Sequence, residues 1–406
     1  MELLLTSTPV LDKWQVADAY MLRDFWVGAP LKKGQTMLTE VLEKEGIEPF
    51  ALSGPLMVPV SEQTLRLMSL PLLTEHLVLL LEKDFLPSEQ NLELLKKYAN
   101  QGYKVALQSG KHVALLKRAQ YLFLDEQEMA HRDRKAIVRA YKRDYKQMKI
   151  IAAPVNTIDE FDSALADSCD LFVGNFYTNL RPAQQKSVLM PIKANLIRLL
   201  NMVRSDSFEF HQVEAVVRQD PALTVSLMRF INSPYIGVRF RVRSIRQAVT
   251  LLGQDEVRKW ATAAVMRSLG TDRPGEWTRL SLIRAKAAEN LAPAFRMEDQ
   301  APSLFLTGLF TLLDVMVDMT MVQALGMISV SEQIRDALLR KPSPYLHVLE
   351  FLLAHEQADW ETVMEYMEKY NIGIEQVYKA YMDAMGWYSD LLTSPVKPVR
   401  SWDDKY

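Results

Sequence analysis

The sequence has few of the residues that most often carry enzyme chemistry. Its 406 residues include one cysteine and six histidines. The lone Cys169 cannot close an intramolecular disulfide, and its neighbour Asp170 disfavours a reactive thiolate. The histidines fall in no spacing typical of a metal site. A zinc enzyme or a cysteine nucleophile is therefore disfavoured, and we predict a packed structural Cys169 and no bound cofactor.

The chain also lacks a large excess of positive or negative charge, and it lacks long apolar runs. The 48 Lys and Arg nearly balance the 50 Asp and Glu, which leaves a net charge of −2 and no global field for a polyanion. No basic leader or uncharged run of membrane-spanning length is present. Phosphate-binding loops and the Gly-x-Ser-x-Gly elbow are missing as well. These absences predict a cytoplasmic protein without membrane contact and without an active site that a short motif reveals.

Residues that are present divide the chain into two regions. The first half alternates short apolar runs with amphipathic stretches such as Glu89–Asn100 and Arg134–Gln147, which is typical of βα units. The strands expected are Leu3–Leu5, Leu56–Val60, Leu77–Leu81, Lys104–Leu107, Tyr121–Leu124, Lys149–Ala152 and Leu171–Val173. Because a complete (β/α)₈ barrel usually takes about 250 residues, we predict an incomplete or trimmed α/β barrel ending near Pro182.

The second half changes to a helical period. Asp220-Pro221 predicts a helix start, since Asp caps helices well and Pro suits the first turn. The helix is expected to stop at Asn232-Ser233-Pro234, and another is expected over Ser244–Leu252 before Gly253. The predicted fold class is thus α/β plus all-α. The predicted domains are residues 1–182, a linker at 183–195, and a helical domain with a C-terminal extension at 196–406.

One basic cluster interrupts the helical half. It consists of Arg229, Arg239, Arg241, Arg243 and Arg246, with Tyr235 and Phe240 interleaved. The cluster could grip phosphate or an acidic partner, or it could be a solvated loop between helices. A helix-turn-helix needs a basic recognition helix, and Ser244–Leu252 offers only Arg246, so nucleic-acid binding is not favoured.

These residues resemble bacterial two-domain proteins that join an EAL domain to an HDOD domain. The stretch Asp220-Pro221-Ala222-Leu223 resembles the start of the HDOD signature. Asn232-Ser233 and, after a second helix, Gly253 resemble its later parts. The stretch Gly308–Asp314 resembles another element of the family. The resemblance implies an all-helical HD-like fold without the metal-binding His-Asp pair, and the matching positions are Thr311 and Leu312.

The first half resembles the layout of an EAL domain but not its chemistry. An active EAL domain hydrolyses cyclic di-GMP with Mg²⁺ or Mn²⁺ held by oxygen ligands. The resemblance places a degenerate pocket at the positions of those groups: Ala19, Arg23, Pro59, Gln108, Ser109, Phe123, Ala153, Asn156 and Val173. Arg23 is the member that retains the family's residue.

The resemblance therefore implies a protein without catalytic or metal-binding residues. We predict a protein-interaction scaffold in bacterial signalling related to cyclic di-GMP, motility or surface attachment. Its expected partner is a regulatory protein such as a kinase or a motility component. The alternative is a non-hydrolysing cyclic di-GMP receptor whose helical domain relays the bound state, although nucleotide binding is not favoured. The sequence leaves the oligomeric state open.

Overall fold

The computed structural model describes most of both halves of the chain. The described residues are 3–26, 42, 46, 49–51, 54–67, 76–108, 111–125, 131–179, 199–203, 208–219, 221–233, 236–238, 242, 244–269, 275–328 and 330–393. The predicted linker at 183–195 lies outside them.

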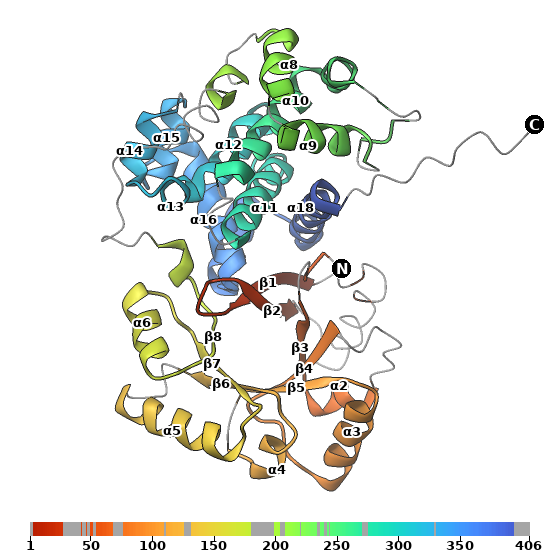
Figure 1. Cartoon of the computed structure of the whole chain (residues 1–406), viewed down its shortest axis with the longest axis vertical. Coiled ribbons are helices and arrows are strands. Elements are labelled where there is room, and N and C mark those ends of the chain that lie inside the picture. Colours follow the sequence, from red (N-terminus) through yellow and green to blue (C-terminus); the bar gives the residue numbers. More distant parts are fainter. Residues whose placement is uncertain are drawn as a thin grey trace, which may run out of the picture.

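Eight strands close into a barrel in chain order (Figure 1). They are β1 (Leu3–Leu11), β2 (Ala17–Trp26), β3 (Leu56–Val60), β4 (Leu77–Leu81), β5 (Lys104–Leu107), β6 (Tyr121–Asp125), β7 (Lys149–Ala153) and β8 (Leu171–Phe172). The β1–β2 hairpin is antiparallel, with Leu3 opposite Trp26, and β2 through β8 run parallel to one another. The single pair Leu11 and Phe172 joins β1 to β8 and closes the ring.

The expectation of an incomplete barrel was wrong in strand number. Six predicted strands fall on β3 to β8, β1 is longer than expected, and β2 was missed. The barrel is shortened at α4 instead, which is only 4 residues long between described neighbours. Among the described residues, its helices are α2 (Glu62–Leu67), α3 (Glu89–Asn100), α4 (Val113–Leu116), α5 (His131–Asp144) and α6 (Ile158–Ala166), followed by the 3-10 turn η2 (Phe176–Thr178).

The second half has helices and no strand among its described residues, as predicted. Its helices are α8 (Phe210–Gln219), α9 (Pro221–Ile231), α10 (Ile245–Leu269), α11 (Gly275–Leu291), α12 (Ala301–Leu309), α13 (Leu313–Val317), α14 (Met321–Gly326), α15 (Glu332–Leu338), α16 (Pro344–Gln357), α17 (Trp360–Tyr370) and α18 (Ile374–Thr393), with 3-10 turns η4 (Glu298–Gln300) and η5 (Phe310–Leu312). Gly253 has a φ of 74° and a ψ of 173°, which are not helical, so two helices meet at a kink within α10 and the predicted helix end at Gly253 is confirmed.

The helical domain packs against the β1–β2 side of the barrel. Helices α11, α16 and α18 lie over β1 and β2, while the barrel's own helices surround the opposite strands (Figure 1). Arg279 and Glu276 of α11 form an ion pair of 3.4 Å in this interface, with side chains 4% and 8% exposed. Arg279 also donates to Ser7 Oγ at 2.9 Å, and the Tyr20 hydroxyl donates to Glu276. Polar side chains thus fix how the two domains dock.

Among the described residues, one stretch is long and apolar enough to cross a membrane by length and composition. It runs from Glu298 to Val317, and 61% of its most apolar window is buried inside the protein. The 3-10 turn at Phe310–Leu312 interrupts it. A buried core segment of a folded domain passes the same test, so this stretch alone defines no membrane span.

Candidate functional site

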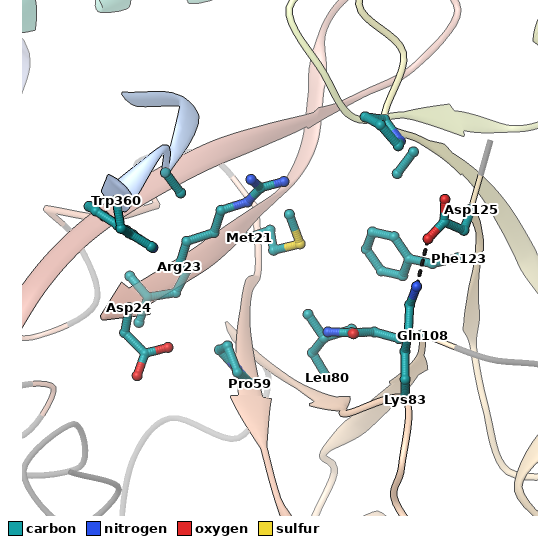
Figure 2. Close-up of a pocket in the computed structure, with 14 residues that line it drawn as sticks. Met21, Arg23, Asp24, Pro59, Leu80, Lys83, Gln108, Phe123, Asp125 and Trp360 are labelled. Carbon is teal, nitrogen blue, oxygen red and sulfur yellow. Dashed lines mark hydrogen bonds and ion pairs between the residues drawn. The ribbon is translucent and has the colours of Figure 1, made fainter. Parts of the chain in front are cut away.

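A pocket of about 490 Å³ opens at the carboxyl ends of the parallel strands. This end of a (β/α)₈ barrel is where such folds carry their active sites. The pocket is lined by Met21, Leu22, Arg23, Asp24, Pro59, Leu80, Lys83, Gln108, Phe123, Asp125, Ala153, Pro154, Ala358 and Trp360. Figure 2 shows Arg23 and Trp360 on one side and Lys83 with Asp125 on the other.

Alternation along the strands explains which side chains reach the pocket. The barrel interior below it is filled by Val10, Ala19, Met21, Met57, Val78, Leu80, Ala106, Tyr121, Phe123, Ile151, Leu171 and Val173. Successive inward positions on one strand are two residues apart, so Arg23 follows Ala19 and Met21 toward the mouth. Packed apolar side chains thus form the floor on which the pocket rests.

The structure brings together several residues of the degenerate pocket. Arg23, Pro59, Gln108, Phe123 and Ala153 all line it. They come from β2, β3, β6 and β7 and from the residue that follows β5. These positions are far apart in the sequence, so no local pattern indicates that they lie close together.

Other predicted members of the pocket lie elsewhere. Ala19 and Val173 are fully buried in the barrel interior, beneath the pocket rather than in its lining. Asn156 lines a second cavity, at the domain boundary. Ser109 lies outside the described residues.

The donor set of the pocket does not fit a divalent metal. Such ions prefer several oxygen ligands, and the lining offers two carboxylates, Asp24 and Asp125. Asp125 accepts from Lys83 at 2.6 Å, which neutralises it. Burial raises the pKa of nearby Glu82, and the charges of Asp84 and Asp24 raise it further. In the part of the chain that the structure describes, no three His, Cys, Asp or Glu groups gather as metal ligands would.

The helical domain covers part of the pocket mouth through residues 357–360, which we call the α16–α17 corner. Arg23 Nη1 donates to the carbonyl of Gln357 at 3.2 Å, at the end of α16 where the helix dipole is negative. The ring of Trp360 stacks on Phe25 with centroids 5.9 Å apart. Burial lowers the pKa of Arg23. No pattern in the sequence indicates that Trp360 reaches the barrel, because only domain docking brings it there.

The second cavity contains the positions where the resemblance places the lost His-Asp pair. Thr311 and Leu312 both line it. Thr311 Oγ1 accepts from Arg284 Nη1 at 3.0 Å and donates to the Gly308 carbonyl at 2.7 Å, while Leu312 is buried. These side chains stabilise the packing of α11 against α12, where a Cβ on Gly308 would lie 2.5 Å from the Arg284 carbonyl oxygen.

Residues of the HDOD signature stabilise the start of α9 and the loop that follows it. Pro221 begins α9 as predicted, and Leu223 is buried in the core. The Asn232 amide donates to Met228 and Val242 carbonyls, and its oxygen accepts from the Val242 amide at 2.9 Å. Asn232 thereby ties the loop after α9 back to the helix.

Only part of the basic cluster can be placed. Ser233 beside it is buried, and Arg229 and Arg246 are both exposed. Asp220, Arg239, Arg241 and Arg243 lie outside the described residues. The cluster therefore remains a prediction.

The fold and its pockets define a class of protein: a closed α/β barrel docked rigidly by side-chain contacts onto an all-helical domain. The particular family of the helical part follows from comparison with known proteins. Residues 189–334 match the HDOD domain family, so the second half contains an HDOD domain.

Two curated relatives are similar across both halves. The Cyclic di-GMP phosphodiesterase CdgJ of Vibrio cholerae is 25% identical over 331 residues, which cover 80% of this chain and 76% of that protein. The uncharacterized protein YuxH of Bacillus subtilis is 25% identical over 274 residues, covering 67% of this chain and 66% of that protein.

Solved structures are similar to the barrel half. The phosphodiesterase PaMucR in complex with c-di-GMP is 17% identical over 43% of this chain and 94% of that chain, with a TM-score of 0.36. The YkuI protein of Bacillus subtilis, which has an EAL domain and was solved with c-di-GMP and calcium, is 14% identical over 43% of this chain and 54% of that chain, also with a TM-score of 0.36.

Proposed function

We propose that this chain is a regulatory protein of cyclic di-GMP-related signalling that has no phosphodiesterase activity and acts in the cytoplasm by binding other proteins. One observation supports the loss of activity most strongly: Pro59, Gln108, Phe123 and Ala153 line the pocket at the carboxyl ends of the strands. None of these side chains offers a carboxylate to a metal ion.

Metal-assisted hydrolysis needs an ion that lowers the pKa of its bound water and neutralises the charge developing on phosphate. Asp24 and Asp125 are the carboxylates of the lining, and Lys83 already holds Asp125. A divalent ion here would have to displace Lys83 and would then find at most two protein carboxylates, so water and phosphate oxygens would have to supply its remaining ligands. This poor donor set supports the proposed loss of the reaction for which the relative CdgJ is named.

Metal binding tests this part of the proposal. We expect thermal unfolding of the purified chain to be unaffected by millimolar Mn²⁺, because an ion that binds only the folded state would raise the unfolding temperature. CdgJ serves as the positive control. A saturable, Mn²⁺-dependent rise in unfolding temperature that Asp125→Asn abolishes would contradict the proposal.

The protein-binding role rests on the exposed part of the basic cluster. Arg229 and Arg246 lie on α9 and α10 and are both exposed. We expect affinity capture from a bacterial lysate to recover a kinase or a motility component, and the double variant Arg229→Glu, Arg246→Glu to lose it. The matched control is Arg143→Glu, which changes an exposed arginine of the barrel helix α5. Capture that is equal in the three proteins would contradict a role for the cluster.

A second candidate function is a cyclic di-GMP receptor. Arg23 and Trp360 line one pocket and offer a phosphate-binding fork and an aromatic face for a base. Arg23 donates to Gln357 through Nη1, so a phosphate bound to the same guanidinium would lie beside the α16–α17 corner. Calorimetry with cyclic di-GMP decides this candidate: heat that Arg23→Ala removes and Arg143→Ala keeps would support it. No heat at tens of micromolar nucleotide would end it.

A further inference from the structure

A second cavity, of about 530 Å³, lies between the last barrel loops and the helical domain. The barrel contributes Asn156, Asn175, Thr178 and Asn179 to its lining. The helical domain contributes Arg284, Thr311, Leu312, Leu338, Arg340, Leu349, Leu353 and Gln357. Arginines and carboxamides thus face one space from both domains, and nothing in the proposed function uses them.

One of the two arginines gives this cavity a cationic side chain, because the charge of the other is neutralised by Glu356. Glu356 holds Arg284 in a fork, accepting from Nε at 2.9 Å and from Nη2 at 2.8 Å. Burial lowers the pKa of Arg340, and the charge of Arg284 lowers it further, while Glu350 partly offsets both effects. Among the ion pairs between described residues, none includes Arg340. Arg340 therefore carries a cationic charge that an anion in the cavity would stabilise.

The barrel side is held rigidly in place. Asn179 Nδ2 donates to the Asn156 carbonyl at 2.8 Å, and the Asn175 amide donates to Asn156 Oδ1 at 3.3 Å. Gly174 precedes this loop with a φ of 150°, and a Cβ there would lie 1.9 Å from the Val155 carbonyl oxygen. Only glycine permits that approach, so the loop is fixed against the β7–α6 connection before any ligand arrives.

We propose that this interdomain cavity binds a purine mononucleotide, with its phosphate at Arg340 and its base facing the carboxamides of Asn175 and Gln357. Arginine suits phosphate because its planar fork makes paired charge-assisted hydrogen bonds. Asn and Gln suit a purine edge because each offers an adjacent donor and acceptor. The volume of about 530 Å³ falls within the range of small-molecule pockets.

Because the lining comes from both domains, a bound nucleotide would bridge them. This proposal goes beyond the proposed function and is independent of the barrel pocket. Neither Arg23 nor Asp125 lines the second cavity. Lys83 also lines the barrel pocket and not the second cavity, so Lys83→Ala serves as a variant that leaves binding here unchanged and separates a failure of this proposal from a failure of the receptor candidate.

Calorimetry on the full chain tests it with AMP, GMP and inorganic phosphate as probes. We expect a nucleotide to bind at least about tenfold more tightly than phosphate, since only the nucleotide engages the carboxamides. Arg340→Asn should weaken nucleotide binding about tenfold or more. Asn is chosen because Arg340 has a φ of 59°, a conformation that Asn tolerates. The matched control is Arg335→Asn, an exposed arginine of α15 outside the cavity.

A second variant separates binding from folding. Asn175→Ala should weaken nucleotide binding and leave phosphate binding and the unfolding temperature unchanged. The proposal is overturned if neither nucleotide binds at millimolar concentration, if Arg340→Asn binds as the wild type does, or if phosphate binds as tightly as the nucleotides. Equal losses in Arg340→Asn and Arg335→Asn would overturn it as well, because a general change in charge would then account for both.

Discussion

Removal of the Glu276 carboxylate should uncouple the two domains at a large cost in stability. Glu276→Ala leaves Arg279 in an interface where its side chain is 4% exposed, without its ion-pair partner at 3.4 Å. It also removes the acceptor of the Tyr20 hydroxyl. Among the described residues, Arg279 keeps the hydrogen bond to Ser7 Oγ at 2.9 Å and the contact with the Tyr20 ring at 4.8 Å.

Breaking a buried ion pair from one side typically costs about 3–5 kcal/mol, because a charge stays buried and unpaired. Burial lowers the pKa of Arg279, but the charge of Glu276 and the neighbouring tyrosines together raise it. A guanidinium is not deprotonated in proteins, so Arg279 stays charged when Glu276 is removed. We therefore expect the free energy of unfolding to fall by about 3–5 kcal/mol in Glu276→Ala. The double variant Glu276→Ala, Arg279→Met should recover much of this loss, since no charge is left behind.

The assay is urea unfolding followed by tryptophan fluorescence, because Trp277 lies in the interface and its Nε1 donates to the Tyr177 carbonyl at 2.6 Å. Glu365→Ala, at an exposed position of α17, should change stability by no more than about 0.5 kcal/mol. A loss below about 1 kcal/mol in Glu276→Ala, or no recovery in the double variant, would refute the view that this polar cluster fixes the docking of the domains.

Three further predictions follow from buried or closely packed groups. Burial lowers the pKa of His355 to about 4, so the unfolded chain binds that proton first as the pH falls. The free energy of unfolding should drop by about 3 kcal/mol between pH 6.5 and pH 4. Denaturation measured across this pH range should show a smaller drop for the variant His355→Phe. Trp360→Ala should speed hydrogen exchange in β2, because the ring no longer stacks on Phe25; unchanged exchange would argue against the covering role. Gly308→Ala should cost about 1–3 kcal/mol in thermal unfolding, since its Cβ meets the Arg284 carbonyl at 2.5 Å, whereas Gly386→Ala has open space and should not destabilise.

Strands with continuous apolar runs could be predicted from the sequence. Leu56–Val60, Leu77–Leu81 and Lys104–Leu107 match β3, β4 and β5 because parallel strands are buried on both faces. The strand Ala17–Trp26 was missed because it carries Asp18, Arg23 and Asp24 among its apolar residues. Its charged positions are tolerated because Lys149 pairs with Asp18 at 2.6 Å and the helical domain meets Arg23.

The candidate site was only partly predictable. The family resemblance named Pro59, Gln108, Phe123 and Ala153 together, and all four line one pocket because strand ends in a barrel converge. The same alignment put Asn156 with them, yet this residue follows β7 and turns toward the helical domain. The contribution of Trp360 and the whole second cavity arise from contacts between distant segments, for which a single sequence holds no local pattern.

Turnover of cyclic di-GMP tests the central claim most directly. The purified full chain is incubated with cyclic di-GMP and Mn²⁺ at neutral pH, and the linear product is measured by chromatography, with CdgJ of Vibrio cholerae as the positive control. The account predicts product from CdgJ and none from this chain above the buffer control, because its pocket lacks the carboxylates that a metal-bound water requires. Metal-dependent product that purifies with this chain and disappears in Asp125→Asn would contradict it.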